Sequence, residues 1–317
     1  MWKKTLLGIA AVVVAAVGGL YCALYQPDIP RRVLEAKYAA PPSQFVVLKD
    51  GARVHYRIRG PVGAPVLVLL HGSNSSLFDW EPWSKNLSDR FRVVTVDLPG
   101  HGLTGAVPNG DYSEQGMAVF VKEFADKIGL GRFAIGGNSM GGGVAARFAE
   151  LYPTRVAQLI LVDAMGMQTQ FGDRLPLAFR LARTPVLNLL LLHITPRSLI
   201  VEGLNDAIVR KSALSDTLID EYWDFARMAG TRQATIARFR LQPDTYVRDR
   251  VGAIKVPVLI LWGEKDHLIP VAAAHAWAKA IPDAKLIVYP DMGHLPMEED
   301  PAETADAVRA FLGTPAS

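Results

Sequence analysis

The chain has 317 residues, half of them hydrophobic and 21% charged, which excludes a globally disordered protein and leaves enough apolar side chains for a sizeable core. Its formal charge is only +3 and its lysines and arginines are scattered, so the sequence lacks the basic stripe that nucleic-acid binding requires. Cys22 is the only cysteine, which excludes an intrachain disulfide, a multi-cysteine zinc site and a redox-active thiol pair.

The first 30 residues differ in composition from the rest of the chain. An uncharged run rich in Ala, Val, Leu and Gly extends from Thr5 to Tyr25, directly after Lys3 and Lys4. At about 1.5 Å per residue, a helix of this length reaches roughly 30 Å, the thickness of the hydrocarbon core of a bilayer. We therefore predict an uncleaved N-terminal transmembrane helix within residues 1–30.

Other interpretations of this segment remain open. The small residues at Ala15–Gly18 resemble a signal-peptide cleavage site, so secretion after cleavage is the alternative to an anchor. A lipoprotein is disfavoured because Tyr21, rather than a small residue, precedes Cys22. Lysines before the run predict a cytoplasmic N-terminus, with the rest of the chain outside the cytoplasm and periplasmic in a bacterium. Arg31 and Arg32, just beyond the run, weaken that orientation.

From Pro41 onward, short apolar runs alternate with stretches of helical length. Asp50-Gly51, a turn-forming pair, lies between the first two runs and indicates an antiparallel hairpin. The later runs are almost entirely apolar, as in parallel strands buried on both faces, so we predict a three-layer α/β sandwich. The predicted strands are Phe45–Leu48, Val54–Ile58, Val66–Leu70, Val93–Val96, Phe133–Ile135, Leu159–Val162, Val258–Trp262 and Leu286–Tyr289, and the predicted core helices include Tyr112–Ile128 and Gly141–Tyr152.

One interval, between Val162 and Val258, contains no convincing strand. Its helical patterns predict an insertion above the carboxyl edge of the sheet, where ligand sites gather in open α/β sheets. Such a helical cap would supply the walls of a substrate pocket. The predicted cap spans residues 164–250 with helices at Leu175–Leu192, Leu204–Leu214 and Thr217–Ala229, and the core comprises residues 41–163 and 251–314.

A Gly-Asn-Ser-Met-Gly pentapeptide centred on Ser139 directly follows one predicted strand, and the small-residue helix start Gly141–Ala145 follows it. Glycines on either side of a serine allow a sharp strand-to-helix turn and keep other side chains away from the strained residue. The N-terminus of the following helix favours negative charge nearby. This context predicts that Ser139 is a nucleophile.

A serine nucleophile needs a base, and the base needs a carboxylate to orient it. His294 follows the last predicted strand and Asp266 follows the strand before it, so both lie at the same sheet edge as Ser139. The order Ser, Asp, His is the one expected for this arrangement. Asp163, at another strand end, and Asp291, which is very close to His294 along the chain, are competing candidates for the acid.

Backbone donors for the oxyanion are predicted at Ser73, which follows the strand Val66–Leu70, and at Met140. We interpret His55, within an early strand, and His193, in an apolar stretch, as packing or surface residues, and we expect His275 on a helix. His71 is interpreted as a structural loop residue, and Asp97 and His101 as parts of a tight turn rather than catalytic residues.

Five motifs occur in an order that resembles the α/β-hydrolase superfamily, in its serine-hydrolase branch. They are His-Gly at 71–72, Asp-Leu-Pro-Gly-His-Gly at 97–102, Gly-Asn-Ser-Met-Gly-Gly at 137–142, Gly-Glu-Lys-Asp at 263–266 and Gly-His at 293–294. The resemblance covers Gln44 to Leu312 and implies a triad of Ser139, Asp266 and His294, an oxyanion hole at Ser73 and Met140, and no metal or organic cofactor. The absence of aspartate at the elbow argues against dehalogenases and epoxide hydrolases.

The resemblance implies hydrolysis of carboxylic esters through an acyl-enzyme, and membrane-anchored monoacylglycerol lipases and bacterial lipases look especially similar. Lipophilic or acylglycerol-like esters are expected, because Pro185–Ile194 is apolar and an anchor would hold the chain at a membrane. The predicted partners are therefore an ester and the membrane. A carbon–carbon bond hydrolase or cofactor-free haloperoxidase-like enzyme is the alternative, although Ser73–Ser75 lacks the Gly-Pro-Gly pattern of the former. A non-enzymatic ligand-binding protein is the third possibility.

Overall fold

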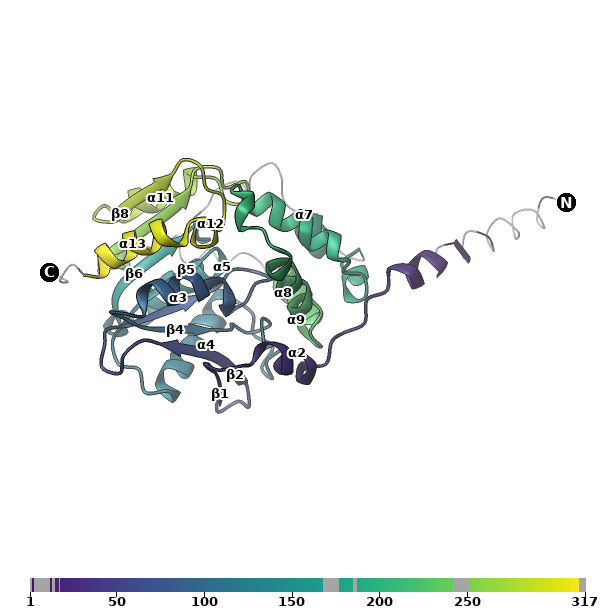
Figure 1. Cartoon of the computed structure of the whole chain (residues 1–317), viewed down its shortest axis with the longest axis horizontal. Coiled ribbons are helices and arrows are strands. Elements are labelled where there is room, and N and C mark those ends of the chain that lie inside the picture. The colour runs from purple at the N-terminus through teal and green to yellow at the C-terminus, as the bar shows by residue number, and fades with distance from the viewer. Residues whose placement is uncertain are drawn as a thin grey trace.

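The protein is described here by a computed structural model that covers residues 2, 12, 15–16, 18–167, 177–184, 187–241 and 251–313. All eight predicted strands are present. They are β1 (Ser43–Val47), β2 (Arg53–Arg59), β3 (Val66–Leu70), β4 (Arg92–Val96), β5 (Phe133–Asn138), β6 (Val156–Val162), β7 (Val258–Gly263) and β8 (Lys285–Tyr289). They form one sheet in the order β1-β2-β4-β3-β5-β6-β7-β8 (Figure 1). β2 runs antiparallel to β1 and to β4, and the other neighbours are parallel.

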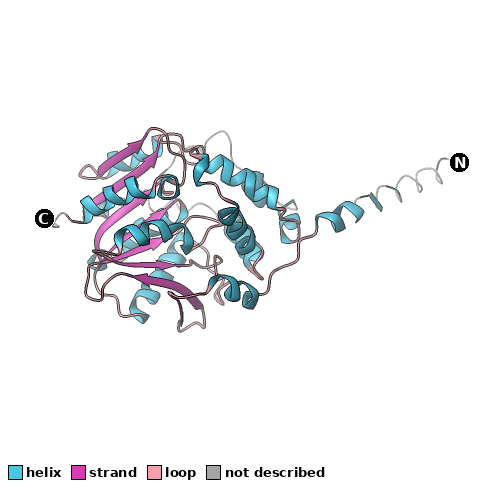
Figure 2. Cartoon of the chain, viewed as in Figure 1, coloured by secondary structure: helices cyan, strands magenta, loops and turns pink. Residues whose placement is uncertain are grey.

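Helices lie in front of and behind this sheet, which makes the sandwich three-layered (Figure 2). α3 packs against α13, where Nε1 of Trp83 donates to Oγ1 of Thr304 at 2.9 Å, and α4 packs against α5. The α-helices are α2 (Arg31–Tyr38), α3 (Glu81–Leu87), α4 (Glu114–Lys127), α5 (Met140–Leu151), α6 (Leu177–Arg183), α7 (Arg197–Ala207), α8 (Asp216–Ala226), α9 (Thr231–Arg240), α11 (Ala272–Ala280), α12 (Pro296–Glu299) and α13 (Pro301–Leu312). Short 3-10 helices are η1 (Leu77–Trp80), η2 (Pro153–Arg155), η3 (Leu187–Leu192), η4 (Lys211–Ala213) and η5 (Val251–Ala253).

The central strands are buried on both faces, as their apolar sequences predict. Every residue of β5 and β7 is buried. β5 extends three residues beyond the predicted end at Ile135, because Gly136, Gly137 and Asn138 continue the parallel pairing with β6. Glycine and asparagine carry no apolar signal, so the sequence pattern could not mark this extension. It matters because it brings the strand directly to Ser139.

The cap occupies the interval between β6 and β7 and is helical, but its helices differ from the predicted ones. The predicted helix Leu175–Leu192 is wrong as a single element, because α6 ends at Arg183 and the separate turn η3 follows. Thr184 precedes a proline, and a residue in that position disfavours helical backbone. α7 begins after Pro196, well before the predicted Leu204–Leu214. α8 agrees closely with prediction, whereas α9 was not predicted.

The segment before the core also carries an unpredicted helix, α2, which lies beside the cap helices α8 and α9 (Figure 1). Its only buried residue, Leu34, forms a small second core with Leu103 from the sheet domain and with Phe225 and Met228 from the cap.

Polar contacts extend this attachment of the N-terminal segment to the cap. Lys37 Nζ and Tyr38 Oη both donate to Asp224 of α8, at 2.8 and 2.9 Å. Ile29 N donates to Arg227 O, and Gln26 N donates to His193 O, each at 2.7 Å. Residues 26–39 therefore join the cap before the chain enters the sheet.

The predicted transmembrane helix lies mainly outside the described residues, which include only Val12, residues 15–16 and residues 18–25 of the run from Thr5 to Tyr25. Residues 18–24 are helical and extend away from the folded body (Figure 1). In the part of the chain that the structure describes, no helix has both the length and the apolar character needed to cross a membrane. The anchor stays a prediction.

Candidate active site

Ser139 occupies the turn between β5 and α5 in a strained backbone conformation, with φ of 53° and ψ of −119°. A left-handed φ is unfavourable for a residue with a side chain, so the surroundings must hold it. Ser139 N donates to Val162 O at 3.0 Å, and Met165 N donates to Ser139 O at 2.9 Å. A Cβ at Gly137 would approach the carbonyl oxygen of Gly141 to 2.2 Å, so this sharp strand–turn–helix requires the glycine.

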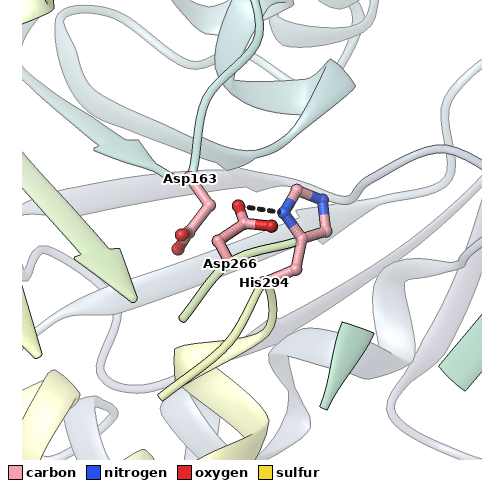
Figure 3. Close-up of side chains that lie close together, drawn as sticks. All are labelled: Asp163, Asp266 and His294. Carbon is pink, nitrogen blue, oxygen red and sulfur yellow. Dashed lines mark hydrogen bonds and ion pairs between the residues drawn. The ribbon is translucent and has the colours of Figure 1, made fainter. Parts of the chain in front are cut away.

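His294 lies between β8 and α12, with its ring hydrogen-bonded to Asp266 (Figure 3). Nδ1 of His294 is 2.7 Å from Oδ2 of Asp266, and both side chains are buried. A carboxylate bonded to Nδ1 fixes the tautomer that leaves Nε2 free to accept a proton. Oδ1 of Asp266 accepts from Leu268 N at 2.7 Å and from Ile269 N at 3.0 Å, so the carboxylate itself is held in place.

The backbone of His294 is fixed by the core and by the cap. Its amide donates to the carbonyl oxygen of Ala207, at the end of α7, at 2.7 Å. Its own carbonyl oxygen accepts from Nδ2 of Asn138, the neighbour of Ser139, at 2.9 Å. Ser139 and His294 line the same pocket between the sheet and the cap. The structure thus brings together Ser139, Asp266 and His294, the three predicted residues.

The competing acids are placed differently. Asp163 follows β6 and lies beside Asp266 (Figure 3). Its Oδ1 accepts from Gly263 N at 3.0 Å. Burial, and then the charge of Asp266, raise the pKa of Asp163 well above its usual value, which favours the neutral form of this carboxyl. Asp291 is exposed and forms an ion pair with Arg210 at 2.9 Å. His294 bonds to neither of them among the described residues.

Asp163, Asp266 and His294 are the one group of described residues whose donor atoms cluster tightly enough to suggest a metal site, all within 4.8 Å of one another. The donor set does not favour that use. Nδ1 of His294 is bonded to Asp266, whose other oxygen accepts two backbone N–H groups. A cation would have to replace these hydrogen bonds, so the cluster fits a proton-transfer pair better than a metal centre.

Of the two predicted oxyanion donors, Met140 follows Ser139 along the chain and Ser73 lines the same pocket as Ser139. Met140 is the first residue of α5, where a backbone N–H has no partner within the helix. Ser73 lies in the loop after β3, which packs closely on the elbow. A Cβ at Gly72 in that loop would lie 2.8 Å from Oδ1 of Asn138 and 3.4 Å from Cβ of Ser139.

The other polar residues near the strand ends hold loops. Nδ1 of His55 is 2.6 Å from Asp97, whose carboxylate also accepts from Leu77 N and Leu103 N at 2.8 and 2.7 Å. His71 Nε2 accepts from Leu98 N at 3.0 Å. Burial lowers the pKa of His71, which favours the neutral ring that can accept this hydrogen bond.

The pocket is mostly apolar but contains charged residues that the sequence analysis missed. Arg238 of α9 donates to Ser73 Oγ at 2.6 Å. Asp79 of η1 is fully buried and accepts from Tyr222 Oη at 2.9 Å. No motif marks these residues, because each depends on how the cap lies on the core. The apolar walls include Phe179, Leu199, Ile200, Leu204, Phe239 and Leu268.

The fold and the site geometry agree with the comparison to known families. Residues 65–301 match the family model described as the alpha/beta hydrolase fold. The match covers most of the chain, and the protein therefore belongs to the α/β-hydrolase family. It is an α/β hydrolase with an eight-stranded, mostly parallel sheet.

Similar proteins include esterases, a phospholipase and a carbon–carbon bond hydrolase. The crystal structure of a membrane phospholipase A, a bacterial virulence factor, is 26% identical, with a TM-score of 0.73 and 98% of each chain covered. A thermophilic esterase from Thermogutta terrifontis is 28% identical, with a TM-score of 0.70, covering 85% of this chain and 98% of the esterase. The 2-hydroxy-6-oxononadienedioate/2-hydroxy-6-oxononatrienedioate hydrolase of Cupriavidus pinatubonensis is 29% identical over 287 residues, which are 86% of this chain and 95% of that enzyme.

Proposed function

We propose that the protein hydrolyses carboxylic esters with Ser139 as nucleophile, His294 as base and Asp266 as the carboxylate that orients the base. The observation that carries the proposal is the hydrogen bond of 2.7 Å between His294 and Asp266, at a pocket that Ser139 also lines. The similarity to a phospholipase and to an esterase supports ester hydrolysis.

The reaction has two halves. His294 Nε2 takes the proton of Ser139 as the hydroxyl oxygen attacks the ester carbonyl, and the N–H groups of Ser73 and Met140 stabilise the oxyanion. The alcohol leaves with the proton held by His294, and an acyl-enzyme remains. Water then attacks the acyl group while His294 accepts its proton, and His294 returns that proton to Oγ of Ser139 as the acid is released. Asp266 stabilises the imidazolium in both halves.

The substrate class follows from the pocket walls and the sequence of the N-terminal segment. The apolar side chains around Ser139 favour a lipophilic acyl chain or an acylglycerol-like ester. We also propose that residues 1–30 anchor the enzyme in a membrane, with the catalytic domain outside the cytoplasm. Extraction of the full-length protein by detergent but not by alkaline carbonate would support the anchor, and release by carbonate would contradict it.

Ser139→Ala tests the nucleophile. We expect it to lower the hydrolysis of p-nitrophenyl esters by at least about 10³-fold while the thermal unfolding curve stays close to that of the wild type. A fluorophosphonate probe should label the wild type and not the variant. Ser75→Ala, which alters another serine that lines the pocket, is the control and should keep the label. Unchanged hydrolysis by Ser139→Ala would refute the assignment.

The similarity to a carbon–carbon bond hydrolase favours a second candidate on the same residues. The same nucleophile and base could cleave a ring-fission product of an aromatic compound. The two activities separate in a direct comparison of p-nitrophenyl esters of two to sixteen carbons with a vinylogous diketone substrate. Turnover of the diketone alone would favour the second candidate.

A further inference from the structure

The pocket contains a positive charge that the proposed ester chemistry does not use. Arg238 projects from α9 of the cap and lines the pocket together with Ser139 and His294. Its Nη2 donates to Ser73 Oγ at 2.6 Å and to Asn74 Oδ1 at 3.3 Å. Both acceptors are neutral, and both belong to the loop after β3 that carries a proposed oxyanion donor. The guanidinium therefore contacts this loop inside the pocket that Ser139 also lines.

Arg238 has no anionic partner among the described residues, unlike most of the arginines around it in the cap. Arg197 pairs with Asp216 and Asp220, and Arg227 pairs with Asp224. For Arg238 no such ion pair occurs, and its Nε is buried without a hydrogen-bond acceptor in the described part of the chain. A partly buried cation with an unsatisfied buried donor is unfavourable unless something compensates for its lost hydration.

The neighbourhood of Arg238 strengthens its attraction for an anion. Burial, and then the charge of Arg183, which lines the same pocket, lower the pKa of Arg238 to about 10. Arg238 is therefore still charged at neutral pH. The centre of the Phe239 ring lies 4.4 Å from Cζ of Arg238, and the other walls of the pocket are largely apolar. In such a setting a carboxylate or phosphate would meet little competing water, and a guanidinium can bind either one through two parallel hydrogen bonds.

We propose that Arg238 recognises an anionic group of the substrate, so that the enzyme acts on amphiphilic esters that carry a carboxylate or phosphate near the scissile bond. This inference rests on the proposed ester hydrolysis for its reaction, but the anion site itself does not depend on turnover. Apolar walls would hold the hydrocarbon part, and Arg238 would select esters in which a negative charge lies within reach of the Ser73 loop.

Matched substrates that differ in one anionic group test the proposal. One pair is p-nitrophenyl hexanoate and the mono-p-nitrophenyl ester of adipic acid, which tests a carboxylate. The other pair is oleoyl glycerol and oleoyl lysophosphatidic acid, which tests a phosphate. We expect the wild type to favour the anionic member of at least one pair about 10-fold or more in kcat/KM. Arg238→Met should abolish that preference while still hydrolysing the neutral ester, and Arg238→Lys should restore part of it.

A merely structural role for Arg238 gives a different result. If Arg238 only positions the Ser73 loop, Arg238→Met lowers the rates for the neutral and anionic esters by the same factor, which overturns the proposal. The absence of any anionic preference in the wild type overturns it as well. Arg197→Met is the control, because that arginine lies on the outside of the cap in exposed ion pairs, and it should leave the preference unchanged.

A binding measurement separates failure of this inference from failure of the proposed function. Calorimetry with decyl phosphate and decanol, below the micelle concentration, needs no turnover and can use the Ser139→Ala protein. We expect decyl phosphate to bind at least about 10-fold more tightly than decanol, and Arg238→Met to remove the difference. If no ester is hydrolysed but this difference occurs, the esterase proposal fails and the anion site stands. Equal binding of the two probes rejects the anion site.

Discussion

Two aspartates follow neighbouring strands beside His294, and their hydrogen-bond partners differ. Asp266 accepts two backbone N–H groups and the imidazole, so its negative charge is stabilised. Asp163 receives one backbone N–H, and its other oxygen is buried without a partner in the described residues. Its raised pKa is the expected consequence of burial beside a carboxylate. Burial therefore favours the neutral form of Asp163, and Asp266, which is bonded to Nδ1 of His294, is the acid placed to stabilise an imidazolium.

Substitution of each aspartate by asparagine should separate these roles. Asp266→Asn removes the charge and favours the wrong tautomer of His294, so we expect kcat to fall by roughly 10³–10⁴-fold. Asp163→Asn replaces a carboxyl that is not bonded to His294 by an amide of the same shape, so kcat should change less than about 3-fold. Steady-state kinetics with one ester at pH 7.5 measure both. If Asp163→Asn caused the larger loss, the acid would be Asp163 instead.

At the scale of elements, the cap meets the core through buried acids. Asp79 of η1 contacts Tyr222 of α8, and Ser76 Oγ donates to Glu221 of α8 at 3.0 Å. Burial, opposed by hydrogen bonds from Ser75 and Tyr222, raises the pKa of Asp79 to about 7. Burial, and then the charge of Asp79, raise the pKa of Glu221 to about 8. The charged and titratable groups around them are Asp97 after β4, His294 after β8, Glu298 of α12 and Arg57 of β2.

This cluster predicts that the fold loses stability as pH rises from about 4 toward 8. Both acids have folded-state pKa values above the unfolded values of about 4, so the folded protein keeps protons that the unfolded chain releases. The slope is at most about 1.4 kcal/mol per pH unit for each acid. Asp79→Asn should therefore flatten the dependence, and urea unfolding at pH 5 and pH 8 measures it.

Asp89→Asn is the control for the pH experiment, because its carboxyl is exposed at the far end of the fold and pairs with Arg309. The control should keep the slope of the wild type. A wild-type protein that gains stability between pH 5 and pH 8, with Asp79→Asn indistinguishable from it, would show that the cluster does not dominate.

Elements also show how far the sequence could predict the structure. Strand β3 was predicted residue by residue, because a buried parallel strand is a continuous apolar run with clear ends. The turn around Ser139 was predictable because a side chain in place of its glycines would clash with neighbouring backbone. The positions of the cap helices α7 and α9 were not predictable in this way. In α9, for example, the apolar residues form no dominant face. Arg238 belongs to such a helix, and its position in the pocket depends entirely on how that helix packs.

At the scale of the whole molecule, the N-terminal segment belongs structurally to the cap. Leu34 of α2 is 1% exposed and contacts a cluster shared by the sheet domain and the cap. Leu34→Ala should lower the free energy of unfolding by about 2–4 kcal/mol, since it leaves a cavity among Leu103, Phe225 and Met228. Urea denaturation measures this loss. Hydrogen exchange in α8 should also quicken, because α8 loses part of its support.

The adjacent residue of the same helix provides the control for that prediction. Val33 is 49% exposed, so Val33→Ala removes methyl groups of α2 without opening the cluster and should change stability by less than about 0.5 kcal/mol. Faster exchange confined to α2, with α8 unchanged in Leu34→Ala, would show that the cap does not depend on this contact.

The attachment of residues 26–39 to the cap affects which parts of the protein can be exchanged between relatives. In the sequence, residues 164–250 form one continuous insertion that recombination could replace as a single segment. In the structure the cap has two parts, because Gln26 and Ile29 bond to cap backbone and Lys37 and Tyr38 bond to the side chain of Asp224. A chimera that receives a foreign cap would have to receive the matching N-terminal segment with it. Substitutions in the cap at these contacts should therefore be accompanied by substitutions in residues 26–39 among related proteins.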